Sequence, residues 1–188
     1  MSSNPDGQLT FWTVGHSSRP YDEFEELLRS AAITLVADVR RYPGSRKFPR
    51  YGADNLAASL EAAGIEYRHF PELGGRRKAS IDSRHTAWRN ESFRAYADYM
   101  DTEEFTRGIG RLLELAHEER LAIMCSEAVW WRCHRGLIAD YLKVRGHRVI
   151  HLLSPTRRDE HPYTSAATVV DGHLDYSGDG ERSDSPLD

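Results

Sequence analysis

Residues 123–135 hold the residue types best suited to covalent chemistry in this chain. Cys125 ends a short apolar run that predicts a buried strand, and a predicted helix begins a few residues later. The positive end of a helix and nearby arginines favour the thiolate, which is the reactive form of cysteine. We therefore expect Cys125 to be a nucleophile with a lowered pKa, and Glu127 and His134 to move protons beside it. An inert thiol buried in the core is the alternative.

A metal site is a second interpretation of the same segment. Cys125, Cys133 and His134 are chemically suitable ligands, although no Cys-x-x-Cys pair accompanies them. The sequence requires no cofactor, but zinc or iron would suit these donors. Two cysteines are too few for a disulfide framework, so we expect both to be thiols in a reducing cytosol.

Arginines dominate the remaining candidates. Guanidinium groups bind phosphate and carboxylate through two parallel hydrogen bonds, so a basic cleft predicts an anionic ligand. We expect Arg40 and Arg135 to bind that anion, whereas in the alternative Arg40 pairs with a neighbouring carboxylate such as Asp38. His16 is expected to complete the catalytic group as a proton carrier. The candidate ligand-contacting residues are Ser17, Asp38, Arg40, Gly74, Gly75, Arg76, Trp88, Arg132 and Arg135.

These residues predict an enzyme that uses a cysteine thiolate in a basic cleft on a small anionic or nucleotide-like substrate. Such an enzyme would be a transferase or hydrolase, and sulfur transfer is one reaction of this kind. A nucleic-acid-binding or repair-like protein is the alternative from another class, because arginines and tryptophans also grip a strand or a flipped base. Basic and acidic residues nearly balance before the C-terminal part, which argues against broad coating of DNA.

The elements that must position these residues alternate between strand and helix patterns. Helical spacing lies between the strands, and Asn90 and Thr102 are the expected N-caps of two helices. This alternation predicts a single α/β domain, with a mainly parallel five-stranded sheet and helices on both faces. Ligands bind beyond the carboxyl ends of parallel strands, where His16, Arg40 and Cys125 fall. Five short apolar runs predict the strands: 11–15, 35–39, 65–70, 121–125 and 149–153.

The chain has 188 residues and a net charge of −4, and its acidity is concentrated near the end. We expect an N-terminal extension (1–10), the α/β domain (11–155), a C-terminal extension (156–177) and a disordered acidic tail (178–188). Residues 76–88 show no periodicity and are expected to form a long loop or lid. No apolar run approaches the ~20 residues of a membrane span, and the first residues lack a secretory pattern. We therefore expect a cytoplasmic protein without a membrane partner; the sequence does not indicate the oligomeric state.

An ordered set of motifs resembles the bacterial and archaeal domain-of-unknown-function 488 family. The motifs lie at residues 13–17, 35–40, 43–46, 71–76, 88–90, 93–100, 125–127 and 133–135. The resemblance spans roughly residues 11–153 and implies a fold and a site, but no reaction. Family members often have proline before the tryptophan of the cysteine loop, where this chain has Val129 followed by Trp130 and Trp131. This departure is expected to reshape the loop and the substrate pocket.

A weaker resemblance is to rhodanese-like sulfurtransferases and cysteine phosphatases. Residues 36–40 resemble the Asp-Val-Arg strand end of rhodaneses, and Cys125 leaves a strand before a helix as their catalytic cysteine does. Phosphatases place an arginine six positions after the cysteine, where this chain has Trp131, and the usual loop glycines are absent. The resemblance therefore implies thiol chemistry, without a phosphate cradle of backbone amides.

Overall fold

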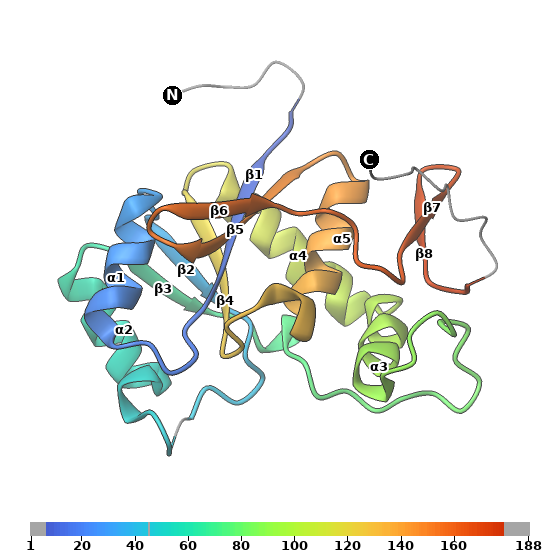
Figure 1. The fold of residues 1–188 in the computed structure, drawn as a ribbon, viewed down its shortest axis with the longest axis horizontal. Helices are drawn as coiled ribbons and strands as arrows, with labels where there is room; N and C mark the ends of the chain where they lie inside the picture. Colours follow the sequence, from blue (N-terminus) through green and yellow to red (C-terminus); the bar gives the residue numbers. More distant parts are fainter. Residues whose placement is uncertain (1–6, 45, 179–188) are drawn as a thin grey trace.

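A six-stranded sheet forms the centre of the molecule (Figure 1). The computed structural model describes residues 7–44 and 46–178. The strands lie in the order β3-β2-β4-β1-β5-β6, and all neighbours are parallel except β5 and β6. Their bounds are β1 (Thr10–Gly15), β2 (Leu35–Asp38), β3 (Glu66–His69), β4 (Leu121–Cys125), β5 (Arg148–Ser154) and β6 (Arg157–Glu160).

The mainly parallel α/β architecture is confirmed, but the predicted number of strands is wrong. The sixth strand, β6, has the sequence Arg-Arg-Asp-Glu and lies at the edge of the sheet, antiparallel to β5. A strand without apolar residues gives no hydrophobic pattern in the sequence. Backbone pairing with β5 and the ion pair between Glu160 and Arg148 hold β6 in place. Charged residues on an edge strand also discourage pairing with other chains.

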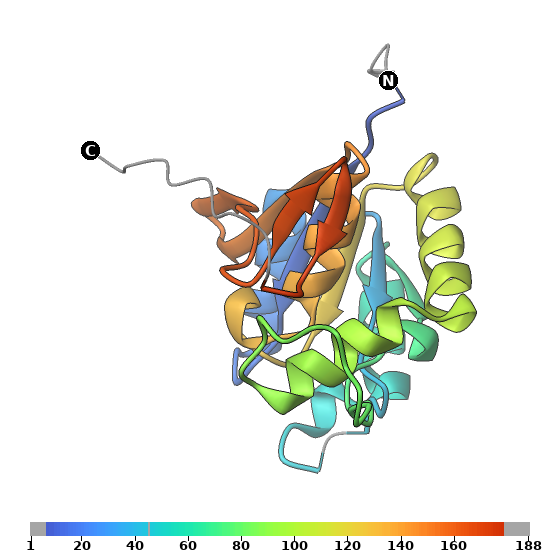
Figure 2. The ribbon, with the colours of Figure 1, turned by 90° about the vertical axis from the view of Figure 1, so that its right-hand side faces the viewer.

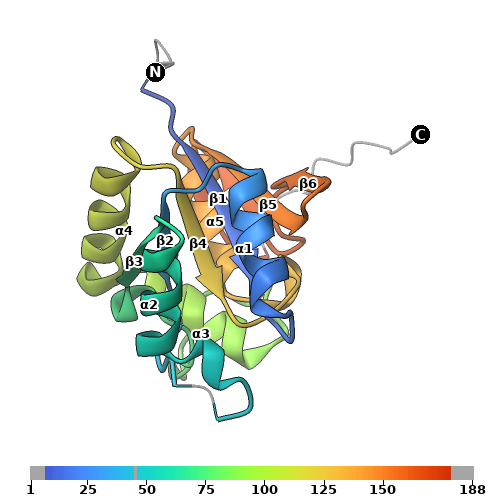
Figure 3. The ribbon, with the colours of Figure 1, turned by 90° about the vertical axis from the view of Figure 1, so that its left-hand side faces the viewer.

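Helices cover both faces of the sheet, as the alternation predicted (Figures 1 and 3). The helices are α1 (Tyr21–Ser30), α2 (Ala53–Ala62), α3 (Glu91–Met100), α4 (Glu103–Ala116) and α5 (Arg135–Val144). Phe24 of α1 and Leu56 of α2 belong to one apolar core, and Phe105 of α4 and Leu137 of α5 belong to the other. The chain runs from β1 through β2 to β3 in one direction and then returns through β4 to β5. Right-handed crossovers in opposite directions place their helices on opposite faces.

Helices α3 and α4 begin at the caps that the sequence predicted. The Asn90 side chain accepts hydrogen bonds from Ser92 N and Phe93 N at the start of α3. Thr102 Oγ1 accepts from Phe105 N at the start of α4. These short polar side chains satisfy backbone donors that have no partner inside the helix.

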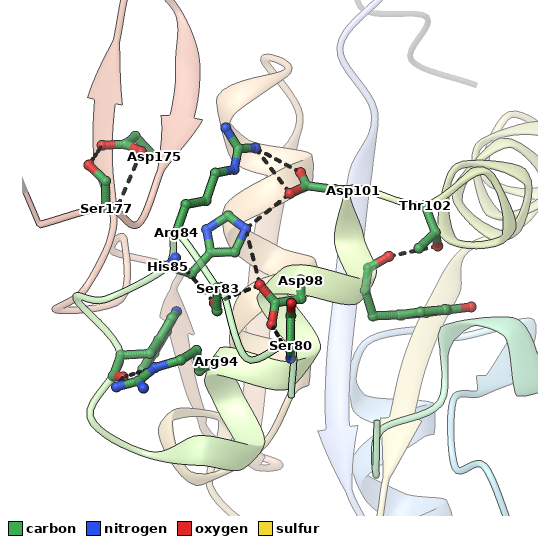
Figure 4. A network of polar contacts seen from close by, with 12 residues as sticks. Ser80, Ser83, Arg84, His85, Arg94, Asp98, Asp101, Thr102, Asp175 and Ser177 are labelled. Atoms are coloured by element: carbon green, nitrogen blue, oxygen red, sulfur yellow. Dashed lines mark hydrogen bonds and ion pairs between the residues drawn. The ribbon is translucent and has the colours of Figure 1, made fainter. Parts of the chain in front are cut away.

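Residues 76–90 contain no helix or strand and are fastened to α3 (Figure 4). His85 is buried, and its Nε2 lies 3.1 Å from Asp101 Oδ2, while Arg84 donates two hydrogen bonds to the same carboxylate. Asp98 accepts from Ser83 Oγ at 2.6 Å and from the backbone N–H of Ser80 at 3.0 Å. The predicted loop is therefore present, and two carboxylates near the end of α3 hold it against that helix.

The segment after Pro155 packs into the apolar core that contains Phe105 of α4 and Leu137 of α5. Tyr176 is 2% exposed, and its hydroxyl donates to Asp140 Oδ2 of α5 at 2.7 Å. Between β6 and Tyr176, the hairpin of β7 (Thr168–Val170) and β8 (His173–Asp175) lies beside α5 (Figure 2). The expected extension 156–177 thus packs with the α/β domain. The expected tail falls, from residue 179 on, outside the described residues.

No helix in the described ranges is long and apolar enough to cross a membrane.

Tyr176→Ala should test the contribution of the C-terminal segment to the core. Truncating a fully buried aromatic residue costs about 3–5 kcal/mol through lost burial and a residual cavity. Denaturant unfolding of the full chain measures this loss. Val169→Ala is the matched control, because Val169 is 46% exposed in the same segment and should change stability by less than about 0.5 kcal/mol. Equal stabilities of the two variants would contradict the role of the segment.

Candidate functional site

A pocket of about 680 Å³ opens at the carboxyl ends of β1, β2 and β4. Gly15 of β1 pairs with Cys125 of β4, and Asp38 of β2 pairs with Met124, so the three strands end at one level. The reversal in strand order leaves a crevice at this edge, as is usual for binding sites in parallel sheets. The predicted site residues that line it are His16, Ser17, Arg40, Gly75, Arg76, Cys125, Glu127, Arg132, Cys133 and His134.

Two thiols and an imidazole meet in this pocket. Cys125 is 6% exposed and Cys133 is 4% exposed. The two Sγ atoms and one ring nitrogen of His134 all lie within 4.8 Å of one another. His134 Nε2 donates to the carbonyl of Val39 at 3.1 Å, because a carbonyl oxygen only accepts. The lone pair of a neutral ring then resides on Nδ1, 3.7 Å from Cys133 Sγ. This geometry suits proton exchange with a thiol and also suits a soft metal ion.

The guanidinium of Arg135 lies beneath the thiols and is 2% exposed. Its Nε donates to Cys133 Sγ at 3.4 Å, its Nη1 to Thr13 Oγ1 at 3.2 Å and its Nη2 to the carbonyl of Glu127 at 2.5 Å. In the part of the chain that the structure describes, no carboxylate pairs with this cation. The sulfur of Cys133 is thus the one partner among these three that can carry a negative charge.

The two thiols differ in acidity. Burial raises the pKa of Cys133, but the hydrogen bond with Cys125 and the charge and hydrogen bonds of Arg135 outweigh burial and lower this pKa. The hydrogen bond with Cys133, followed by burial, raises the pKa of Cys125. The expectation of a lowered pKa at Cys125 is therefore wrong. Helix α5 begins at Arg135, so its first N–H and its guanidinium reach Cys133 instead.

Arg40 is held by the alternative contacts that the sequence allowed. Asp38 is fully buried and accepts from Arg40 Nη2 at 2.6 Å, from Arg40 Nε at 2.9 Å and from the Tyr67 hydroxyl at 2.7 Å. Arg40 Nη1 donates to the carbonyl of Tyr51 at 2.7 Å. Arg135 does not line the pocket, and the charge of Arg40 is balanced internally. These contacts do not support anion binding by the two arginines, which stays a prediction.

His16 supports Arg40 and is not suited to carrying protons. Its Nδ1 donates to the carbonyl of Ser17 at 2.9 Å, and its Nε2 accepts from Arg40 Nη1 at 3.3 Å. The ring stacks on Tyr51 with centroids 4.1 Å apart. Burial, followed by the charge of Arg40, lowers the pKa of His16 to about 4 against the raising effect of the Ser17 carbonyl. A neutral ring with both nitrogens occupied orients Arg40 instead.

The cations that remain for a ligand are Arg41, Lys47, Arg76 and Arg132, which line the pocket and are exposed or half-buried. Arg41 and Lys47 come from a segment whose basic residues were not distinguished by spacing, so sequence reasoning did not select them. Gly74 lies outside the pocket lining, and a Cβ there would lie 2.7 Å from Arg41 Cα. This glycine therefore allows two backbone segments to pack closely.

Trp88 and Trp130, two of the tryptophans expected to stack on a base, pack against side chains of the protein instead. Trp88 packs edge-on against Phe93 with centroids 5.0 Å apart and does not line the pocket. Trp130 stacks on His151 at 4.6 Å, while Trp131 is 52% exposed. Other aromatic residues line the pocket in their place, and no spacing marked them: Tyr42, Phe48, Phe93 and Tyr96.

A row of buried polar side chains leads from Arg135 away from the pocket. Thr13 Oγ1 lies 2.7 Å from His151 Nδ1, and His151 Nε2 lies 2.8 Å from His161 Nδ1. His161 Nε2 lies 2.9 Å from Asp140 Oδ1, which ends the row. Thr13, His151, His161 and Asp140 are each no more than 1% exposed. The row spans β1, β5, the segment after β6 and α5.

The hydrogen bonds of this row run in one direction. Burial lowers the pKa of His151 to about 2, so this ring carries a single N–H. Asp140 Oδ1 accepts from His161 Nε2, and His161 Nδ1 accepts from His151 Nε2. His151 Nδ1 accepts from the Thr13 hydroxyl, whose oxygen accepts from Arg135 Nη1. This assignment gives every proton an acceptor, whereas the reverse assignment leaves the Thr13 hydroxyl without one. The row therefore fixes the orientation of the guanidinium that faces Cys133.

The fold and the pocket define an α/β protein with a thiol-bearing site at the carboxyl edge of a parallel sheet. The chain belongs to the family described as Domain of unknown function DUF488, whose model matches residues 20–142. This match confirms the resemblance to the family and includes the motifs from residue 35 to residue 135, whereas the motif at 13–17 and His151 lie outside it. No curated protein and no solved structure matches the chain, so the resemblance to rhodaneses and cysteine phosphatases stays a prediction.

Thr13→Val should raise the pKa of Cys133. The change leaves Arg135 Nη1 and His151 Nδ1 without partners and costs about 1–3 kcal/mol of stability. It also frees the guanidinium to turn from the sulfur, so the labelling of Cys133 with iodoacetamide should need a higher pH. Peptide mass spectrometry measures this shift. Thr13→Ser retains the hydroxyl and should restore the original pH dependence; an unchanged profile in Thr13→Val would contradict the orienting role.

Proposed function

We propose that this protein is an enzyme that uses the thiolate of Cys133 as a nucleophile on a small anionic substrate. The observation that carries the proposal is the buried guanidinium of Arg135, which donates to Cys133 Sγ and has no carboxylate partner among the described residues. A buried cation without a counterion costs several kcal/mol, so this position favours a negative charge on the sulfur. The class is that of cysteine-dependent transferases and hydrolases.

Arg135 supports both steps of such a reaction. When the thiolate attacks, a bond forms from Cys133 Sγ to the electrophilic atom of the substrate, and the leaving group departs with its electron pair. The sulfur then carries no charge, and Arg135 loses its counterion. A second acceptor that displaces the sulfur restores the thiolate beside Arg135, so the covalent intermediate is poised for transfer.

Proton transfer falls to the remaining polar groups of the pocket. Cys125 holds the proton that the two thiols share, because its pKa is raised while that of Cys133 is lowered. His134 Nδ1 lies beside Cys133 and can receive a proton, and the Glu127 side chain lines the pocket in solvent contact, where it can activate water. In this proposal Cys125 assists the nucleophile, in place of the nucleophilic role that the sequence suggested.

The substrate is an anion held at the rim of the pocket. Arg40 and Arg135 have their hydrogen-bond partners within the protein, which leaves Arg41, Lys47, Arg76 and Arg132 to meet a ligand. The volume of about 680 Å³ lies within the range of about 300–1,000 Å³ typical of small-molecule sites. A phosphate- or carboxylate-bearing compound of nucleotide size fits both the charge and the volume.

Labelling of the two cysteines across about pH 5 to 9 tests the nucleophile. A thiolate accumulates as the pH rises through its pKa, so Cys133 should react with iodoacetamide below the ordinary thiol range near ~8.5, and before Cys125. Arg135→Met removes the counterion and should raise the half-labelling pH of Cys133. Arg132→Met is the matched control at the rim and should leave it unchanged. Faster labelling of Cys125, or wild-type Cys133 that reacts only in the ordinary range, would contradict the proposal.

Calorimetric titration with inorganic phosphate tests the anion site. A charge-assisted hydrogen bond contributes about 1.5–3 kcal/mol when shielded, and less at an exposed rim, so Arg132→Gln should weaken binding about three- to tenfold. Arg107→Gln is the control, because this side chain is 72% exposed on α4. Equal affinity in wild type and Arg132→Gln would remove Arg132 from the anion site.

A further inference from the structure

We propose that Cys125, Cys133 and His134 bind one soft divalent cation of the Zn²⁺ class, and that the bound ion suppresses the nucleophilic reactivity of Cys133. This inference rests on the proposed function only for its consequence, because the binding itself depends on donor atoms alone. Among the described residues, these three form the one group of His, Cys, Asp and Glu ligands that gathers in this way.

The spacing of the donors fits a tetrahedral ion. Zinc lies about 2.3 Å from cysteine sulfur and about 2.0–2.1 Å from imidazole nitrogen, which places two tetrahedral ligands roughly 3.6 Å apart. Cys133 Sγ and His134 Nδ1 are 3.7 Å apart, and all three donor atoms lie within 4.8 Å of one another. Small side-chain rotations therefore suffice to close the site.

The backbone allows two consecutive residues to serve one ion. Cys133 is extended, with φ −136° and ψ 146°, whereas His134 is helical, with φ −58° and ψ −14°. Neighbours on a continuous strand point to opposite sides, but this change of conformation at the start of α5 brings both side chains into the pocket. Gly75 leaves room beside the ring, since a Cβ there would lie 3.1 Å from His134 Nδ1.

The surrounding contacts orient the donors as metal sites require. The hydrogen bond from His134 Nε2 to the Val39 carbonyl fixes the ring and leaves Nδ1 free to donate its lone pair. Ligating histidines commonly donate their second N–H to a carbonyl in this way. Arg135 contacts Cys133 Sγ from the side of the core, so a cation would approach this sulfur from the pocket.

The chemistry of the donors selects the ion, and the pocket sets its coordination. Two sulfurs and an imidazole favour zinc and similar soft ions over magnesium and calcium, which prefer oxygen ligands. Three protein ligands leave a fourth position facing the pocket of about 680 Å³. The bound ion draws electron density from the Cys133 sulfur and occupies its side toward the pocket, so occupancy lowers nucleophilic reactivity.

The test uses the metal-free full-length chain, titrated with Co²⁺ as a spectroscopic probe and with Zn²⁺ against a chromophoric chelator. We expect one ion per chain, sulfur-to-cobalt charge-transfer bands and tetrahedral ligand-field bands. Cys125→Ser and His134→Gln should each weaken Zn²⁺ binding at least tenfold, and His134→Gln serves alone if the buried serine prevents folding. His117→Gln is the matched control, because His117 is exposed at the end of α4, and it should bind as wild type does.

Alkylation separates the ion site from the proposed function. One equivalent of Zn²⁺ should slow the labelling of Cys133 at least tenfold, and a chelator should restore it. If no stoichiometric ion binds while metal-free Cys133 remains reactive at low pH, the ion site is overturned and the proposed function stands. If the ion binds through sulfur while metal-free Cys133 is unreactive, the proposed function is overturned and the ion site stands.

Discussion

The contact between the buried guanidinium of Arg135 and the sulfur of Cys133 is the constraint on which the site depends. The start of α5 already carries the partial positive charge of a helix N-terminus, and Arg135 adds a full charge at the same place. Water cannot screen this charge, because Arg135 is 2% exposed. The position therefore favours a negative charge on the adjoining sulfur, and the pKa of Cys133 is lowered although burial by itself would raise it.

The same guanidinium joins the elements that enclose the pocket. It reaches Thr13 on β1, the carbonyl of Glu127 after β4 and Cys133 before α5. The loop after β4 consequently folds back over the end of β1, and a Cβ at Gly15 would lie only 1.7 Å from the Glu127 oxygen. Any side chain there would displace the loop and the guanidinium with it. The glycine before His16 is therefore a packing requirement of the site.

Sequence patterns could predict the elements and the edge where the site lies, but not the roles of individual charges. Apolar alternation is a local signal, so it located five strands and missed β6, whose four residues are all charged. The carboxyl-edge rule placed His16, Arg40 and Cys125 at one edge, because parallel strands all end there. The identity of the thiolate depends on which sulfur the first turn of α5 faces. That in turn depends on the short 3-10 helix Trp130–Arg132, whose ends no periodicity defines. Among the described residues, Arg40 has a carboxylate partner and Arg135 has none, and this difference is a property of tertiary packing.

The row from Thr13 to Asp140 explains how the C-terminal segment bears on a site that it does not line. A guanidinium does not release its proton at any ordinary pH, so the row cannot conduct protons from Cys133 to Asp140. Its action is orientation: Asp140 accepts from His161, from Thr164 and from Tyr176, and these donors all follow β6. Because the carboxylate only accepts, the hydrogen of His161 lies on Nε2. His161 Nδ1 then accepts from His151, and His151 Nδ1 accepts from the Thr13 hydroxyl. The segment after Pro155 thus sets where the Thr13 hydroxyl directs its proton, which leaves Thr13 Oγ1 to accept from Arg135 and holds the guanidinium beside Cys133.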